Sequence, residues 1–337
     1  MATVKEIADH LQISSATVSR VLNSRPGIAP TTRQRVLDAA TELGFGRGGV
    51  GLKSSRYIGF VHPLGQFAGN IGEYHAALLG GMGLALGQQQ FDLALIDPYR
   101  DKRHDETYSQ FFMRKDLQGV ILQVRPHNLP VAEAVAREGF PMLLIASALE
   151  HPKANYVVVD SASGYEQAVE HLHHLGHRRI ALVERDVMDY DHTQRTAGFD
   201  RACQRLRLPL EPQLRFQCSA DTRAGSSIVR RIMTMPDRPT AVVFVNSGPT
   251  RGALRACADM GLSVPGDLSI VGFDDGERRF ETVPAYTSVC QDAEALGGEA
   301  ASLIGKLLSG TADTPVRRTL PSIFEVHAST GPPANAT

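Results

Sequence analysis

The chain has 337 residues, 42% of them hydrophobic and 21% charged, which are the proportions of an ordinary globular protein with two or three compact units. It has no apolar run of the roughly 20 residues that a membrane helix needs and no signal-peptide pattern, so we expect a cytoplasmic protein without a membrane partner. The four cysteines are far apart and form no CxxC motif, which favours free thiols in a reducing compartment.

The net charge of −1 is unevenly distributed along the chain. Residues 1–56 contain eight Lys and Arg against four Asp and Glu, a charge of +4, and the remainder therefore carries −5. A small basic head on a mildly acidic body is suited to binding phosphate groups through the head. A solvated charged surface without a ligand is the alternative, and charge alone does not separate the two.

Three short helices are predicted within the first fifty residues. The first begins with a capping box, in which Thr3 and Glu6 satisfy backbone amides of the first turn. Gln12 and Ile13 form a turn, and Ser14 is a good N-cap for a second helix over residues 15–22. The inward-facing residues of these two helices are Ile7, Ala8, Leu11, Val18, Val21 and Leu22.

A third helix is predicted to begin with a second capping box, Thr31-Thr32-Arg33-Gln34, and to end at Gly44. Its buried stripe comprises Val36, Leu37, Ala40 and Leu43. Two helices joined by so short a turn and closed by a third follow the plan of a helix-turn-helix.

The second helix has a polar outer face that suits DNA. Short side chains at its start allow close approach to base edges, and Arg20 can bind a guanine through two hydrogen bonds, worth roughly 1–3 kcal/mol of discrimination. The hydroxyls and amide of Thr17, Ser19 and Asn23 suit phosphate oxygens. An ordinary three-helix cap without a DNA role is the alternative.

The same segments strongly resemble the DNA headpiece of the lactose-repressor (LacI/GalR) family: TVKEIA at 3–8, SSATVSRVLN at 14–23 and TRQRV at 32–36. The resemblance implies base reading by Ser15, Ala16 and Arg20. It implies phosphate contacts by Thr3, Ser14, Thr17, Ser19 and Asn23. The partner would then be operator DNA, and the protein would be associated with the nucleoid.

Residues 44–56 (GFGRGGVGLKSSR) connect the head to the first predicted strand. In the family this segment forms a short helix that inserts a leucine into the minor groove, which implies that role for Leu52. The segment is shorter than the family pattern, and each of its glycines disfavours a helix by roughly 1 kcal/mol. A flexible tether, with Leu52 packing on the body, is an equal alternative.

From residue 57 onward, short apolar runs alternate with amphipathic helical stretches. Strands are predicted at 57–61, 91–96, 119–124, 142–146, 156–159, 179–183, 214–218, 241–245 and 268–273. This alternation is typical of parallel sheets with helices on both faces, and so many strands indicate two similar lobes. We therefore predict an α/β fold: an all-α headpiece and a two-lobed sensor with doubly wound parallel sheets, similar to periplasmic binding proteins.

The predicted domains are a headpiece (1–46), a hinge (47–56) and an effector-binding and dimerisation domain (57–337). Lobe 1 is expected at about 57–150 and 292–337, and lobe 2 at about 156–284. The chain would cross between lobes near 149–159, cross back near 284–291, and continue as a helix over about 292–309.

Ligands bind such sheets beyond the carboxyl ends of the strands, where this chain places polar residues. These are His62, Asp97, Arg125 and Ser147 in the first lobe, and Glu184, Asn246 and Asp274 in the second, with Ala220 beside them. Polar groups that converge in this way suit a hydroxyl-rich ligand, because each buried hydroxyl must find a hydrogen-bond partner.

The family resemblance extends over the body through HHLGHRRIA at 173–181, RTAGF at 195–199 and VPGDLSIVGFDD at 264–275. It implies that Arg195 grips the effector and that Asp274 accepts one of its hydroxyls. The full set of expected effector-binding residues is Tyr74, Arg125, Ser147, Arg195, Asn246, Asp274 and Gln291. Departures from the family pattern at Ser247, Ala220 and the 62–70 loop leave the identity of the ligand open.

Two patterns suggest other chemistry and are better explained by structure. The GxGxxxG sequence at 81–87 lies inside a helical pattern, so tight helix–sheet packing is favoured over nucleotide binding. His171, His173, His174 and His177 lack acidic or thiol partners at metal-ligand spacing, which favours surface and helix-end histidines. No catalytic motif and no cofactor signature is found, so we expect neither an enzyme nor a metal site.

The sequence therefore predicts a homodimeric DNA-binding regulator, with repression the favoured mode. Its operator would be pseudo-palindromic, and its affinity would depend on a small molecule, with a sugar favoured. A solute-binding protein without a DNA role is the alternative, and a sugar-metabolising enzyme comes third.

Overall fold

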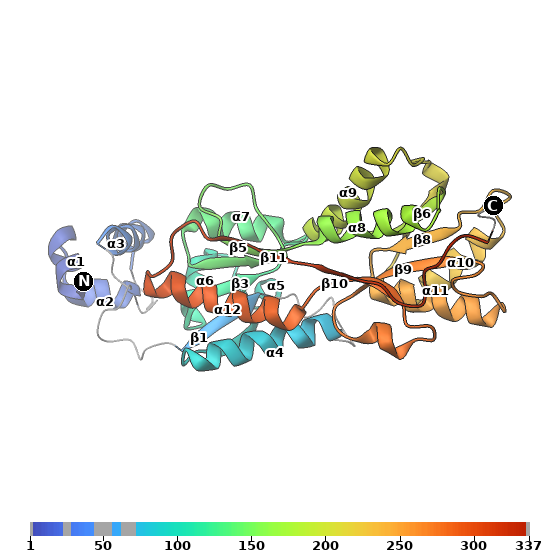
Figure 1. Ribbon diagram of the computed structural model, residues 1–337. Coiled ribbons are helices and arrows are strands. Elements are labelled where there is room, and N and C mark those ends of the chain that lie inside the picture. The colour runs from blue at the N-terminus through green and yellow to red at the C-terminus, as the bar shows by residue number, and fades with distance from the viewer. Residues whose placement is uncertain (1–2, 23–27, 44–55, 62–71, 335–337) are drawn as a thin grey trace. The chain divides into compact units, whose positions relative to one another are not determined.

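The computed structural model describes residues 3–22, 28–43, 56–61 and 72–334. The chain divides into two compact units (Figure 1): Met1–Arg56 with Met113–Leu117, and Tyr57–Phe112 with Gln118–Thr337. The described residues of the first unit form three helices, α1 (Val4–Leu11), α2 (Ser15–Leu22) and α3 (Pro30–Glu42). Their shared core comprises Ile7, Ala8, Val18, Val21, Val36, Ala39 and Ala40.

The predicted start signals of the first two helices are confirmed. The Glu6 amide donates to Thr3 Oγ1 (3.2 Å) and the Thr3 amide donates to Glu6 Oε2 (2.6 Å), which completes the capping box. Gln12 ends α1 in the left-handed region (φ 54°), and Ser14 Oγ accepts from the Thr17 amide (3.0 Å) at the start of α2. These contacts stabilise the short turn that joins α1 to α2.

The predicted start of the third helix is wrong by two residues, because a cap at Thr31 would make Thr32 the first helical residue. The helix α3 begins at Pro30, so Thr31 lies inside its first turn and does not cap it. Proline suits the first helical position, because its fixed φ is already helical. An N–H at this position has no acceptor within the helix, so its absence in proline costs no hydrogen bond. The predicted end at Gly44 lies outside the described residues.

The second unit contains two six-stranded sheets, each with its own helices. The first sheet has the order β11-β5-β4-β3-β1-β2 and the second the order β12-β10-β9-β8-β6-β7. The first sheet contains β1 (Tyr57–Val61), β2 (Asp92–Ile96), β3 (Leu117–Leu122), β4 (Met142–Ile145), β5 (Tyr156–Asp160) and β11 (Arg317–Pro321). The second contains β6 (Ile180–Arg185), β7 (Arg215–Cys218), β8 (Ala241–Phe244), β9 (Ser269–Asp274), β10 (Thr287–Cys290) and β12 (Ile323–Glu325).

Helices surround both sheets, which confirms the predicted α/β class with doubly wound, mostly parallel sheets (Figure 1). The first lobe has α4 (Glu73–Gln88), α5 (Pro98–Asp101), α6 (Tyr108–Arg114), α7 (Leu129–Glu138) and α12 (Ala293–Ser309). The second has α8 (Ser161–His174), α9 (Tyr190–Arg205), η2 (Pro212–Leu214), α10 (Thr222–Met233), α11 (Ser247–Asp259) and η3 (Arg278–Glu281). One face of the second sheet packs on α8 and α9, and the other packs on α10 and α11.

The pairing of three strands corrects the expected lobe boundaries. The strand β5, expected in lobe 2, pairs with β4 and β11 in the first sheet, so the chain crosses after Asp160. The strand β10 belongs to the second sheet, and β12 pairs with it antiparallel, so the chain crosses a third time at Ser322. Short apolar runs beside a crossing do not reveal which sheet completes their hydrogen bonds. The pattern therefore assigned β5 to the wrong lobe, and it did not predict β10 and β12 as strands.

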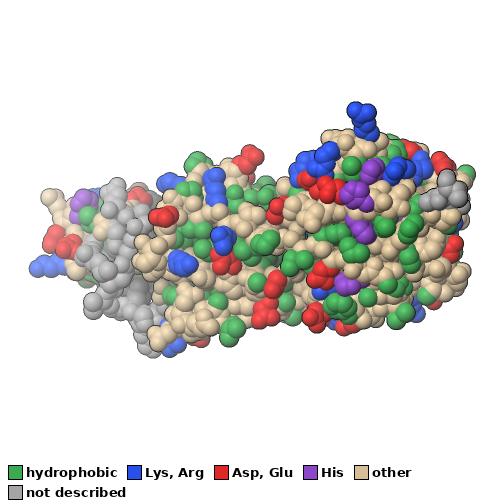
Figure 2. Space-filling model, in the orientation of Figure 1, with side chains coloured by type: hydrophobic (Ala, Val, Ile, Leu, Met, Phe, Trp, Pro, Cys, Tyr) green, Lys and Arg blue, Asp and Glu red, His purple; other side chains and the backbone are tan. Residues whose placement is uncertain are grey.

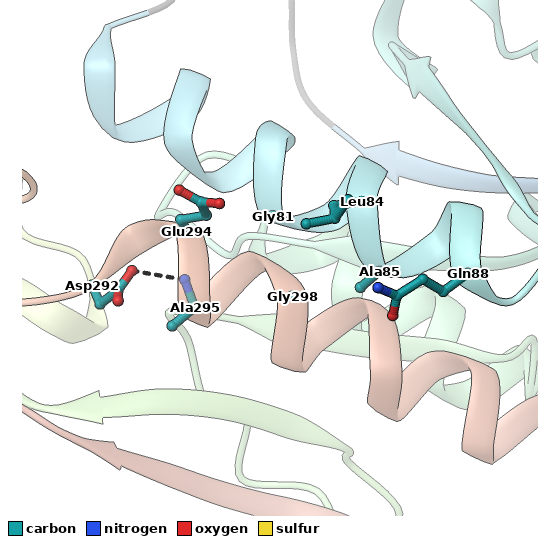
Figure 3. A pocket seen from close by; sticks show the side chains of 8 residues that line it. All are labelled: Gly81, Leu84, Ala85, Gln88, Asp292, Glu294, Ala295 and Gly298. Carbon is teal, nitrogen blue, oxygen red and sulfur yellow. Dashed lines mark hydrogen bonds between the residues drawn. The ribbon is translucent and has the colours of Figure 1, made fainter.

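The glycine motif at 81–87 lies in α4, and its packing partner is another helix. A Cβ on Gly81 would lie 1.9 Å from the Glu294 carbonyl oxygen of α12, so glycine is required for the two helices to approach this closely. Figure 3 shows Gly81 and Gly298 on the facing helices, which border a shallow hollow of about 330 Å³. The expected helix–sheet packing is therefore corrected to helix–helix packing.

One histidine of the 171–177 group is neither at the surface nor at a helix end. His177 is buried, and its ring nitrogens contact Thr240 Oγ1 (2.7 Å) and the Gly331 carbonyl (2.9 Å) of the C-terminal segment. In the described part of the chain, no group of three His, Cys, Asp or Glu side chains is arranged to hold a metal ion. None of the described helices combines the length and hydropathy needed to cross a bilayer.

Candidate functional site

The helix α2 exposes the residues expected to read bases. Ser15, Ala16 and Arg20 are exposed, whereas Val18 and Val21 are buried in the headpiece core. Ala16 and Arg20 are one helical turn apart, so both lie on the outer face. An exposed arginine behind two small residues can approach a base edge without obstruction from its own helix.

The hydroxyls expected to contact phosphates also cap the helices. Thr3 Oγ1 and Ser14 Oγ both accept backbone amides, and the Ser14 and Thr17 hydroxyls contact each other (2.8 Å). A hydroxyl that accepts an amide still has its own proton to donate, so capping does not exclude a phosphate contact. Thr17 and Ser19 are half-buried. Asn23 and Leu52 lie outside the described residues.

Arg195 on α9 forms the centre of a polar cluster in the second lobe. It is 3% exposed, donates from Nη1 to the Val245 carbonyl (2.6 Å) and pairs through Nη2 with Asp191. Its guanidinium lies 3.4 Å from the centre of the Phe273 ring. Burial opposes its charge, but Asp191 and other nearby acidic groups outweigh burial and raise the pKa of Arg195. The cation is therefore held by groups of its own chain.

Asn246 belongs to a hydrogen-bonded series that begins at Asp189. His192 Nδ1 contacts Asp189 Oδ1 (2.7 Å), and Asn246 Nδ2 contacts His192 Nε2 (3.1 Å). Because the amide group of Asn246 donates, His192 accepts at Nε2 and donates to Asp189 from Nδ1. Burial works against the Asp189 carboxylate, but its hydrogen bonds with His192 prevail and lower its pKa to about 2. Asn246 Oδ1 is left buried without a partner among the described residues.

The two carboxylates that follow β9 have different surroundings. Asp274 is 1% exposed, and its Oδ2 accepts from Arg279 Nη1 (2.9 Å) and the Arg279 amide (3.1 Å). Asp275 accepts from Gln291 Nε2 (2.6 Å) and lies near Arg195. Asp274 thus holds the turn after β9 together, whereas Asp275 lies in the polar cluster.

Two first-lobe residues approach this cluster, and one does not. Burial raises the pKa of Tyr74, and so do Asp191 and Asp275, so its hydroxyl lies within electrostatic range of both carboxylates. Burial lowers the pKa of Arg125, whereas Asp189 acts in the opposite direction. Ser147 is fully buried, accepts from the Val124 amide (2.8 Å) and contacts the Ile145 carbonyl (3.0 Å), so it serves the backbone of its own lobe.

The structure thus brings together five of the seven expected effector residues: Tyr74, Arg125, Arg195, Asn246 and Gln291. The sequence reasoning missed Asp189, Asp191, His192 and Asp275. Two local signals could have found some of them, because Asp189 precedes a helix as its N-cap and Asp191 lies one turn before Arg195. The choice of Asp275 over Asp274 depends on the turn geometry, for which the sequence has no signal.

Comparison with known proteins agrees with both parts of this arrangement. A profile for bacterial regulatory proteins of the lacI family matches residues 3–47, and one for a periplasmic binding protein-like domain matches residues 169–330. The HTH-type transcriptional regulator reg1 of Streptomyces lividans is 30% identical over 322 residues, which cover 91% of this chain and 90% of that protein. The chain belongs to the lacI family of bacterial regulatory proteins. This lacI-family chain is therefore a DNA-binding transcriptional regulator, as the sequence predicted.

Solved structures agree on the fold of this lacI-family member. A complex of the transcriptional regulator CelR with cellobiose has a TM-score of 0.71 at 25% identity and covers 98% of this chain and 100% of that one. A lac repressor dimer bound to operator and the anti-inducer ONPF has a TM-score of 0.70 at 21% identity, covering 98% and 99%. These relatives are transcriptional regulators and not enzymes, and the lacI headpiece favours the regulator over a solute-binding protein without a DNA role.

Proposed function

We propose that this lacI-family protein is a cytoplasmic, nucleoid-associated homodimeric repressor whose affinity for a pseudo-palindromic operator depends on a bound sugar. The observation that carries the proposal is the outer face of α2, where Ser15, Ala16 and Arg20 are exposed beside buried Val18 and Val21. The domain division that we propose is a headpiece at 1–46, a hinge at 47–56 and an effector-binding domain from 57 onward.

DNA binding by the headpiece fits the charge of the molecule. Residues 1–56 carry +4 within a chain of net charge −1. On the face of the body visible in Figure 2, acidic and basic side chains are interspersed and form no continuous basic surface. Phosphate attraction is thus assigned to the headpiece, and sequence preference to Arg20 and its small neighbours.

A homodimer is supported by the outward face of α4. Leu84 is 66% exposed there, and Gly80 and Gly83 have open space where a Cβ would lie, so a second helix could approach closely. The similar lac repressor structure is described as a dimer on its operator. Two headpieces related by a two-fold axis would read two related half-sites.

Effector control is supported by the polar cluster of Tyr74, Arg125, Arg195, Asn246 and Gln291, which unites side chains of both lobes. The similar CelR structure is described as a cellobiose complex. A ligand that binds one arrangement of the lobes more tightly shifts their equilibrium, and a coupling of 1–3 kcal/mol would change operator affinity about 5–150-fold.

The test is selection of duplexes from a random pool by the full-length protein, followed by binding titrations of the selected duplex with and without mono- and disaccharides. We expect the selected duplexes to contain two inverted half-sites, and at least one sugar to change the affinity. Single, unrepeated sites would contradict the dimer. An affinity that no sugar, sugar phosphate or purine changes would contradict effector control.

A further inference from the structure

We propose that His192 is a positioning residue for effector binding: together with Asp189 it determines which atom of the Asn246 amide faces the effector, and its protonation reverses that amide. The inference rests on the function proposed above, because Asn246 is one of the proposed effector residues. It adds a pH-dependent element that lies wholly within the second lobe.

The contact between Asp189 and His192 fixes one proton of the imidazole ring. Asp189 Oδ1 lies 2.7 Å from His192 Nδ1 and also accepts the His192 backbone amide (3.1 Å). Burial opposes the charge of Asp189, but its hydrogen bonds with His192 prevail and lower its pKa to about 2. This carboxylate is therefore ionised throughout the neutral range and can only accept. Nδ1 thus carries a proton whether the ring is neutral or charged.

The second ring nitrogen is then an acceptor in the neutral ring and a donor in the charged ring. Asn246 Nδ2 lies 3.1 Å from His192 Nε2, and an amide nitrogen only donates. This contact therefore belongs to the neutral ring. When Nε2 takes up a proton, two donors face each other, and only the Asn246 oxygen can accept from the charged ring.

Reversal of the amide changes the atom on its other side. Asn246 Oδ1 is buried and has no partner among the described residues, so the neutral state presents an acceptor there. In the charged state the NH2 group takes that place and presents donors. A ligand group that donates is suited to the first state, and one that only accepts is suited to the second.

The backbone of Asn246 is held independently of its amide. Asn246 is the N-cap residue of α11, yet its side chain makes no capping hydrogen bond, although asparagine is among the preferred capping residues. Thr250 donates to the Asn246 carbonyl from its hydroxyl (2.7 Å) and from its backbone amide (3.3 Å). Rotation of the side-chain amide leaves these contacts intact.

Charges of both signs surround the Asp189–His192 pair. Asp189 attracts a charged imidazole directly, whereas Arg195 and Arg125 interact with Asp189 and compete for its charge. The other charged and titratable groups nearby are Asp191 on α9, Asp275 after β9, Arg185 at the end of β6, and Tyr74 on α4. Histidines ordinarily change charge between about pH 5 and pH 8, so the reversal is sought in this range.

The first experiment needs no ligand. The full-length protein, labelled with nitrogen-15 in its histidine and asparagine side chains, is titrated from about pH 8 to pH 5 and followed by NMR. We expect a neutral His192 ring with its proton on Nδ1 at the upper end, and Asn246 amide signals that shift with the same midpoint as the ring. A neutral ring protonated on Nε2, or an Asn246 amide that does not follow the ring, would overturn the inference and leave effector control standing.

The variant Asp189→Asn separates the choice of tautomer from the helix cap. Asparagine caps a helix about as well as aspartate, so the start of α9 is retained. Its amide can accept or donate, so it no longer fixes the proton on Nδ1. We expect both tautomers of neutral His192 in this variant, and a ring still protonated only on Nδ1 would contradict the role of Asp189.

The second experiment measures the consequence for binding. Glucose, ribose and cellobiose are titrated by calorimetry at about pH 8 and pH 5.5 into the wild type, His192→Gln and the control His174→Gln, which changes an exposed histidine of the same lobe. Glutamine offers a donor and an acceptor but takes up no proton in this range. Asp275 also titrates here, because burial raises its pKa to about 6, so the contribution of His192 is the difference between wild type and variant.

We expect the wild type to lose about tenfold more affinity than His192→Gln as the pH falls, the equivalent of one lost hydrogen bond. The control should behave as the wild type. Equal pH dependence in the wild type and His192→Gln would overturn the inference, and a rise in wild-type affinity would overturn the assignment of Oδ1 as the ligand-facing atom. If no sugar, sugar phosphate or purine is bound, the proposed function fails, and the ligand-free titration still decides the role of His192.

Discussion

Two adjacent glycines of α12 provide a matched test of the packing that positions Tyr74 and Gln291. A Cβ on Gly297 would lie 2.1 Å from the Leu78 carbonyl oxygen of α4 and 3.1 Å from Leu78 Cα. A Cβ on Gly298 would lie 3.7 Å from the Gly81 carbonyl oxygen, an ordinary van der Waals contact. Both positions are inside the same helix, so replacement by alanine changes helix propensity almost equally.

Each substitution should gain roughly 0.5–1 kcal/mol from helix propensity. The methyl group added by Gly297→Ala, however, meets rigid backbone, so α4 and α12 must separate by about an ångström across a core that includes Leu78 and Leu296. Overpacking of this kind costs typically 1–3 kcal/mol and occasionally more. We expect Gly297→Ala to lower the free energy of unfolding by about 1–2 kcal/mol, and Gly298→Ala to raise it by about 0.5 kcal/mol.

The assay is urea unfolding of the two variants and the wild type at one protein concentration, followed by near-UV circular dichroism. The slope of the transition should be unchanged, because the unfolded chains expose the same surface. The order Gly298→Ala, wild type, Gly297→Ala is the expected ranking. Equal stability of the two variants would refute the claim that backbone contact between α4 and α12 requires glycine at position 297.

Three further substitutions test the headpiece and the turn after β9. Thr3→Ala removes the capping box and should destabilise α1 by about 1 kcal/mol, visible as faster amide exchange confined to the headpiece; unchanged exchange would contradict the cap. Arg279→Met leaves Asp274 buried and unpaired, so it should cost about 3–5 kcal/mol in urea unfolding, and a loss below 1 kcal/mol would contradict that pairing. The pKa of Asp275 is raised from 3.8 to about 6, so the folded protein binds this proton more tightly than the unfolded chain and loses stability as the pH rises through that range. Asp275→Asn should therefore be more stable than the wild type by about 1–3 kcal/mol above pH 7 and equal to it near pH 4; a gap that does not change with pH would contradict the raised pKa.

Local signals predicted the headpiece well because its structure is locally determined. The Thr3–Glu6 capping box, the turn at Gln12 and the Ser14 cap each involve contacts within four residues. The first nine strands were also found, since a short apolar run marks most of them, although β2 and β7 are only partly buried. The last three strands were missed, because β10 (TSVC) and β11 (RRTLP) contain few apolar residues and β12 has three residues.

The polar cluster was predicted in part, and for a similar reason. Arg195, Asn246 and Gln291 could be proposed because they follow recognisable motifs or strand ends. That Asp191 already pairs with Arg195, and that Asp274 is committed to Arg279, are facts of tertiary geometry. The sequence analysis named Asp274 and not Asp275, whereas the turn after β9 pairs Asp274 with Arg279 and Asp275 with Gln291.

The central claim is that this lacI-family regulator reads DNA bases through Arg20 on α2. The most direct measurement compares the affinity of the full-length protein for its selected operator with that for a scrambled duplex at one salt concentration. Arg20→Ala should reduce this specificity ratio about 5–150-fold, the equivalent of 1–3 kcal/mol, while affinity for the scrambled duplex falls little.

The control is Arg35→Ala, which removes an exposed arginine of α3. It should lower the affinity for both duplexes by the same factor and leave the specificity ratio unchanged. An unaltered specificity ratio in Arg20→Ala would contradict the account.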